Sequence, residues 1–210
     1  MAPINRLSRD ASVTSIEEKK EFILANEFTL ANRLAYKILH KHPLSIWMIV
    51  IPIVFVYYFY ALNRYKASKK DFVSNFIRSR ENILDKAVGF TEDGQKPDYE
   101  ALAEKENIPD FANGAYKEWA RALFEHFQKL LHTDGDSYAD LVRGKYENRG
   151  QYLKVLDHLN KVESKFYKAL RKDLQDSVED AGGIIKAMEN SLGPIRREEA
   201  DGIFERAPSA

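Results

Sequence analysis

Several features that would identify an activity are missing from this chain of 210 residues. It contains no cysteine, which excludes disulfides, thiolate zinc sites, iron–sulfur clusters and cysteine nucleophiles. It also has no Asn-x-Ser/Thr acceptor site, no glycine-rich phosphate loop and no nucleophile elbow. We therefore predict no catalytic residue, no cofactor and no metal ligand. The function has to be inferred from how charged and apolar residues are distributed.

The formal net charge is zero, but the charge is uneven along the chain. Residues 1–70 carry 11 Lys and Arg against 5 Asp and Glu, whereas residues 71–210 carry 21 against 27. A basic segment is attracted to an anionic membrane surface, while an acidic domain is repelled by anionic lipid and by nucleic acid. The distribution predicts a lipid bilayer as a partner and no nucleic-acid partner.

Residues 43–62, PLSIWMIVIPIVFVYYFYAL, contain no charged residue. As a helix with a rise of about 1.5 Å per residue, this run would span roughly 30 Å, the thickness of the hydrocarbon core of a bilayer. A cleaved signal peptide would have a shorter apolar run with an Ala-x-Ala site after it. A core helix of a soluble protein would not favour Pro52 at its centre, whereas membrane helices tolerate proline. The run therefore predicts a single transmembrane helix.

Basic and aromatic residues flank the run as they do at membrane interfaces. The twenty positions before Pro43 hold three basic residues, and the twenty positions after Leu62 hold six. Positive residues favour the cytoplasmic side, so this bias predicts a single-pass membrane protein with a cytoplasmic C-terminal domain. The predicted membrane-interface residues are Trp47, Tyr57, Tyr58, Tyr60, Arg64, Lys66, Lys69 and Lys70.

An amphipathic helix is predicted before the run. Ser15 and Glu18 have the spacing of a capping box, and apolar residues recur at helical intervals from there to Lys41. The helix either lies in the membrane interface, with Arg33 and Lys37 toward the headgroups, or packs on protein. Amphipathicity alone does not choose between these two arrangements.

The remaining chain also has helical periodicity and no strand-like alternation. Apolar stripes predict helices over 71–88, where Arg80 interrupts the stripe, over 116–131 and over 152–174. Asp98 and Ser137 are candidate N-caps, and helix ends are predicted at Gly89, Gly182-Gly183 and Gly193-Pro194.

The predicted fold is all-α: a single transmembrane helix with an N-terminal amphipathic helix and a C-terminal helical bundle. Its parts are a disordered N-terminus at 1–14, the amphipathic helix at 15–42, the transmembrane helix at 43–62, a basic collar and helical stalk at 63–88, a helical bundle domain at 97–192 and a flexible C-terminal tail at 193–210.

This organisation predicts a non-enzymatic tether, scaffold or accessory subunit that binds another protein or itself through its helical domain. The aromatic residues of that domain are expected mainly in the core. Tyrosine is also common at interfaces, so some of its tyrosines are candidates for contact residues. These candidates are Tyr138, Tyr146, Tyr152 and Tyr167.

Two alternatives stay open. One is a membrane-bound enzyme that uses His126, His132 or His158 with nearby carboxylates, although the spacing of these histidines does not match a metal-binding helix motif. The other is a small subunit of a transporter, which would need oligomers because one uncharged span cannot line a pore alone.

Overall fold

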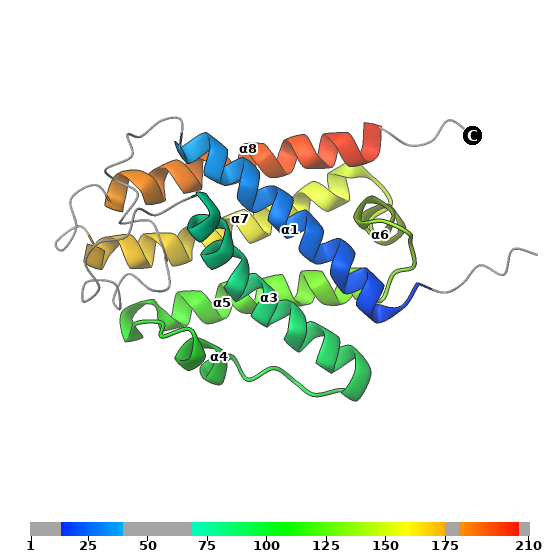
Figure 1. Cartoon of the computed structure of the whole chain (residues 1–210), viewed down its shortest axis with the longest axis horizontal. Helices are drawn as coiled ribbons and strands as arrows, with labels where there is room; N and C mark the ends of the chain where they lie inside the picture. The colour runs from blue at the N-terminus through cyan, green and yellow to red at the C-terminus, as the bar shows by residue number, and fades with distance from the viewer. Residues whose placement is uncertain (1–13, 40–68, 175–180, 206–210) are drawn as a thin grey trace, which may run out of the picture.

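The computed structural model of this chain describes residues 14–39, 69–174 and 181–205, and the secondary structure within these ranges is α-helical (Figure 1). The seven helices in the described ranges are α1 (Ile16–Leu39), α3 (Lys69–Asp93), α4 (Tyr99–Lys105), α5 (Asp110–Leu131), α6 (Tyr138–Lys145), α7 (Arg149–Leu174) and α8 (Ala181–Glu205). The all-α prediction is confirmed for this part of the chain.

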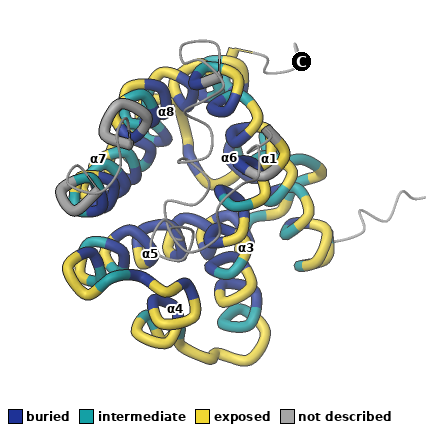
Figure 2. The backbone as a smooth tube through the Cα atoms, turned by 60° about the vertical axis from the view of Figure 1, so that its left-hand side comes forward, coloured by how far each residue is buried: buried dark blue, intermediate teal, exposed yellow. Residues whose placement is uncertain are grey.

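Five long helices form a closed ring around one apolar core. Around the ring, α1 contacts α3, α3 contacts α5, α5 contacts α7, α7 contacts α8, and α8 returns to α1. Figure 2 shows the buried faces of these helices turned toward the inside of the ring. The short α4 packs on α5, and α6 packs against α1, α5 and α8. Each long helix therefore buries its apolar stripe against two neighbours, as in a helical bundle.

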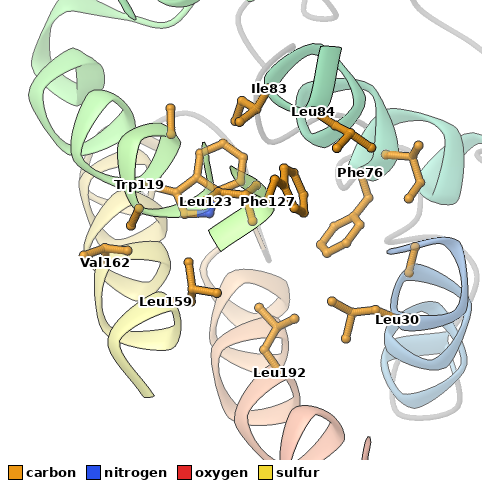
Figure 3. Packing of buried hydrophobic residues seen from close by; sticks show 14 of the residues in the cluster. Leu30, Phe76, Ile83, Leu84, Trp119, Leu123, Phe127, Leu159, Val162 and Leu192 are labelled. Carbon is orange, nitrogen blue, oxygen red and sulfur yellow. The ribbon is translucent and has the colours of Figure 1, made fainter. Parts of the chain in front are cut away.

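Side chains from all five long helices meet in the core. The Trp119 ring stacks on Phe166 with centroids 5.6 Å apart, and Tyr116 contacts the same Phe166 ring edge-on at 5.5 Å. Figure 3 shows core residues of the five helices pointing toward one another, among them Leu30, Phe76, Trp119, Leu159 and Leu192. The expectation that distal aromatic residues mainly form the core is confirmed here.

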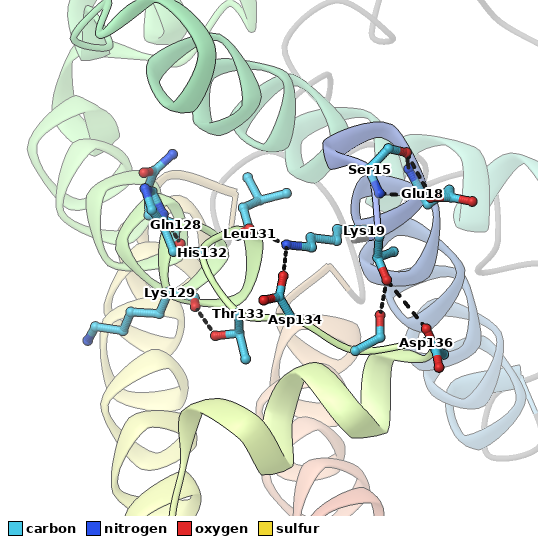
Figure 4. Close-up of polar contacts among 12 residues, drawn as sticks. Ser15, Glu18, Lys19, Gln128, Lys129, Leu131, His132, Thr133, Asp134 and Asp136 are labelled. Atoms are coloured by element: carbon cyan, nitrogen blue, oxygen red, sulfur yellow. Dashed lines mark hydrogen bonds and ion pairs between the residues drawn. The ribbon is translucent and has the colours of Figure 1, made fainter. Parts of the chain in front are cut away.

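Helix starts predicted from capping side chains are confirmed. The backbone N–H of Glu18 donates to Ser15 Oγ at 3.2 Å, and the Glu18 carboxylate accepts from the Ser15 N–H at 2.8 Å (Figure 4). Asp98 accepts from two N–H groups of the first turn of α4, and Ser137 accepts from the Asp140 N–H at 3.2 Å. These bonds satisfy N–H groups that have no partner within the helix.

The three predicted helix ends are wrong. α7 is described only to Leu174, and Gly182-Gly183 belongs to the first turn of α8 instead of ending α7. At the other two positions, packing carries the helix past the residue that should break it. α3 continues beyond Gly89, and α8 runs through Pro194. Residues 193–205 are therefore helical and not a flexible tail. Proline removes one backbone hydrogen bond, but α8 buries Ile195 and Ile203 beyond it. Burying each isoleucine contributes roughly 1.5–3 kcal/mol, which offsets the lost bond.

Within the described ranges, no helix has both the length and the apolar composition to cross a bilayer. The uncharged run at 43–62 falls outside these ranges, and so do six of the predicted interface residues: Trp47, Tyr57, Tyr58, Tyr60, Arg64 and Lys66. The structure thus supports the helical bundle, while the predicted transmembrane helix lies outside the described residues.

Candidate functional site

The helices that bound the uncharged run pack directly against each other. Glu27 of α1 pairs with Arg80 of α3, with 3.0 Å between Oε2 and Nε. Lys20 of α1 pairs with Asp85 of α3, with 3.0 Å between Nζ and Oδ1. Residue numbers rise along α3 as they fall along α1, so the two helices are antiparallel. The last residues of α1 and the first residues of α3 therefore lie at the same end of the bundle (Figure 1).

This packing bears on the predicted single-pass topology, which the described residues do not support. A single crossing between α1 and α3 would place the two helices on opposite sides of a bilayer, about 30 Å or more apart. In the structure, α1 instead lies in the core of the bundle, where Ile23, Leu30, Leu34 and Ile38 are each no more than 3% exposed. At roughly 1.5–3 kcal/mol per side chain, their burial contributes about 6–12 kcal/mol. That is comparable to the whole stability of a typical domain.

Polar contacts hold α1 on the bundle at both of its ends. Near its start, the buried Lys19 donates to the Leu131 carbonyl at 3.3 Å and pairs with Asp134 at 2.9 Å (Figure 4). Near its end, Arg33 and Lys37 both pair with Glu198 of α8. The amphipathic helix therefore packs on protein, and the two basic residues expected to face headgroups contact α8.

Lys69 and Lys70 are the predicted interface residues that fall within the described ranges. Both belong to the first turn of α3, and the Lys70 side chain is exposed. The structure thus places an exposed basic residue at the end of the bundle where the chain returns from the uncharged run.

The three distal histidines do not form a common site. His126 is buried, its Nδ1 lies 3.0 Å from the Tyr146 hydroxyl, and burial lowers its pKa to about 3. His132 contacts the Gln128 carbonyl through Nδ1 at 2.7 Å. His158 lies on the exposed face of α7. In the part of the chain that the structure describes, no group of three or more His, Asp or Glu side chains is arranged to hold a metal ion.

His158 contributes to an open surface hollow between α5 and α7. The hollow is also lined by Lys117, Glu118, Arg121 and Glu125. Its lining mixes both signs of charge, and two of these groups already pair with neighbours, Lys117 with Glu100 and Glu118 with Lys165. Ligand sites are usually enclosed and largely apolar, so this hollow does not define a substrate.

A cluster of four charged side chains lies buried at the centre of the bundle, and sequence analysis did not predict it. Its members are Glu27, Arg80, Glu163 and Arg196, from α1, α3, α7 and α8, and none exposes more than 8% of its side chain. Arg80 pairs with both glutamates, and Arg196 Nη2 lies 2.8 Å from Glu163 Oε2. The two positive and two negative charges balance. The Arg80 guanidinium also lies 3.6 Å above the centre of the Phe76 ring.

Glu163 is the carboxylate that both arginines share. Burial alone would raise its pKa, but Arg80 and Arg196 outweigh burial and hold the pKa of Glu163 below its ordinary value. The Tyr167 hydroxyl also donates to Glu163 at 2.6 Å. Burial raises the pKa of Glu27 in spite of Arg80. Glu163 is therefore the ionised centre of the cluster.

A second polar chain joins α6, α7, α8 and α1 beside this cluster. The Tyr138 and Tyr152 hydroxyls lie 2.9 Å apart, and Tyr152 donates to Glu199 Oε1 at 3.2 Å. Asn26 of α1 donates to the same oxygen at 3.3 Å. Burial raises the pKa of Glu199 to about 7, so this group can take up or release a proton near neutral pH.

The tyrosines proposed as contact residues belong to the interior. Tyr146, Tyr152 and Tyr167 are 6%, 0% and 3% exposed, and Tyr138 is partly buried against the core. They pack on rings or bond to buried groups, and the three buried ones cannot meet a partner. The large apolar side chains that do reach the surface of the described chain are Phe28, Tyr36 and Phe111.

One signal in the sequence marks the charged cluster. Arg80 interrupts the apolar stripe over 71–88. A charge on the buried side of a helix needs a partner of opposite sign. The pattern therefore indicates a buried pair, but the choice of partner depends on how the helices meet.

Comparisons of this chain with protein-family models, with curated proteins and with solved structures found no match.

Proposed function

We propose that this chain is a membrane-anchored helical protein that acts as a tether, scaffold or accessory subunit through protein–protein contacts of its bundle. The observation that carries the proposal is the uncharged run at 43–62, which is inserted between two helices of one bundle. Antiparallel helices are usually joined by about 2–8 residues, so this connection is far longer than the fold requires. Its composition is that of a segment surrounded by lipid.

The exposed face of α1 supports a role in protein contacts. Phe28 and Tyr36 are 40% and 58% exposed and lie eight residues apart, about two turns along the same helix. Aromatic side chains are enriched at protein interfaces because they supply large contact areas. Confinement to a membrane raises the effective concentration of such a surface toward partners at that membrane.

Membrane anchoring is tested with charge substitutions within the run. Full-length chain is expected in the membrane pellet after an alkaline carbonate wash, and it should float with liposomes. The double variant Ile53→Asp with Val56→Asp should release it, because each charge in the hydrocarbon core costs about 2.5–3.5 kcal/mol. Lys154→Asp, on the exposed surface of α7, is the matched control and should stay in the pellet. Wild-type chain in the carbonate supernatant would end the proposal.

The protein contact is tested by cross-linking in intact membranes. The wild-type chain should give a defined cross-linked species with itself or with one partner. The double variant Phe28→Ala with Tyr36→Ala should lose that species, whereas Phe111→Ala, an exposed aromatic residue at the start of α5, should keep it. A wild-type chain that remains monomeric and partnerless contradicts a tethering role.

A further inference from the structure

The two ends of the uncharged run are held together by the bundle. The chain leaves the bundle at the end of α1 and returns at the start of α3, and these two helices are antiparallel neighbours. Both points therefore lie at one end of a single packed domain (Figure 1). A domain of this kind sits on one side of a membrane, so the chain has to leave and return on that side.

The length of the run limits how deeply it can enter the hydrocarbon core of a bilayer. Crossing a hydrocarbon core of about 30 Å twice as helix takes about 40 residues, which is twice the length of this run. Pro52 divides the run into nine residues before it and ten after it. As helix, each part would reach roughly 14–15 Å, about half the depth of the core.

The basic residues around the run fit the same arrangement. Lys41 precedes the run, and Arg64 and Lys66 follow it. A single crossing would divide these charges between two surfaces, although positive residues normally gather on one side. Entry and exit through one leaflet would place them together at one surface, beside the exposed Lys70 of α3. Anionic headgroups attract such a cluster.

We propose that the protein is monotopic: α1 and α3, the described helices on either side of the run at 43–62, lie on the same side of the membrane. The end of the bundle formed by the last turn of α1 and the first turn of α3 faces the headgroups of that leaflet. This inference rests on the proposed membrane anchoring and replaces the single crossing expected from the sequence.

Single-cysteine labelling tests the topology. Because the chain has no native cysteine, only the introduced cysteine reacts with the label. Ala25→Cys lies on the exposed face of α1, before the run, and Lys154→Cys lies on the exposed face of α7, after it. In sealed membrane vesicles from the expressing cells, a membrane-impermeant maleimide should label both variants to the same fraction of the total seen in detergent. Full labelling of one variant with protection of the other would overturn the inference.

The same vesicles separate the two proposals. If alkaline carbonate extracts both variants, the result contradicts the proposed membrane anchoring and therefore also the proposed topology. If both variants stay in the pellet but label on opposite sides, only the monotopic inference fails.

A cross-link between α1 and α3 tests the packing in the membrane. Lys20→Cys with Asp85→Cys replaces an ion pair that joins the two helices, so a short bifunctional maleimide should link them within one chain. Glu21→Cys with Asp85→Cys is the matched control, because Glu21 is exposed on a neighbouring face of α1. The first pair should cross-link several-fold more than the control. Equal yields in membrane-bound chain would overturn the inference.

Discussion

Replacing Glu163 with glutamine should destabilise the bundle strongly, because the buried Arg196 would lose its carboxylate partner and the buried Arg80 would keep only Glu27. Arg80 and Arg196 expose 3% and 4% of their side chains, so water does not screen their charges. Removing one partner of a buried ion pair costs about 3–5 kcal/mol. For a chain of this length, that loss corresponds to a fall of roughly 6–20 °C in Tm.

A double variant separates charge balance from the loss of one contact. Combining E163Q with Arg80→Met removes one charge of each sign and leaves Glu27 and Arg196 balanced. Methionine is unbranched and packs well on aromatic rings, so it can occupy the place of Arg80 above Phe76. The double variant should be about 1–3 kcal/mol more stable than the sum of the two single effects.

The assay is urea or thermal unfolding of the full chain in detergent micelles, followed by circular dichroism. Lys165→Met is the control because it breaks an exposed ion pair with Glu118, and its midpoint should stay near that of the wild type. Unfolding of E163Q at the wild-type midpoint would refute the reasoning, and so would strictly additive effects in the double variant.

Three further predictions concern buried groups and one helix. Burial lowers the pKa of His126 to about 3, so the unfolded chain binds a proton between about pH 3 and 6.5 that the folded chain does not. His126 should therefore contribute stability that rises with pH in that window by up to about 1.4 kcal/mol per pH unit, and His126→Phe should remove this contribution in denaturant titrations. Burial raises the pKa of Glu199 from 4.5 to about 7, so the folded chain keeps a proton that the unfolded chain has lost. The contribution of Glu199 to stability should therefore fall as pH rises from 4.5 to 7, and it opposes the contribution of His126 up to about pH 6.5. Glu199→Gln should abolish that fall, and an unchanged pH profile would contradict the assignment. Pro194→Ala should raise stability by about 1–3 kcal/mol, because Pro194 is exposed inside α8 and alanine restores a backbone donor. A lower unfolding midpoint for that variant would show that the helix depends on the proline.

Local patterns predicted most of the helices and their starts. Ser15, Asp98 and Ser137 each cap a helix as their position before an apolar stripe indicates. Such signals are reliable because a cap and the first turn of its helix are only two or three residues apart in the chain. The predicted helix end at Pro194 was wrong because α8 is stabilised by apolar contacts with other helices, which the local sequence does not show.

The candidate site could be predicted only in part. The uncharged run and its basic flanks are visible in the composition of 43–70. The buried cluster is not, because Arg80 meets Glu163 across 83 positions of the chain. A charge on an apolar stripe shows that a partner is needed, but it does not identify the partner.

The sequence by itself determined that this protein is helical, where most of its helices begin and that one long segment has the composition of lipid-buried chain. These properties depend on interactions between residues that are close in the sequence, so the local sequence is enough to predict them. Only the tertiary structure decided that α1 and α3 lie side by side, with Glu27 against Arg80 across 53 positions. That contact depends on how five apolar stripes close into one ring, which no pattern within a single helix specifies.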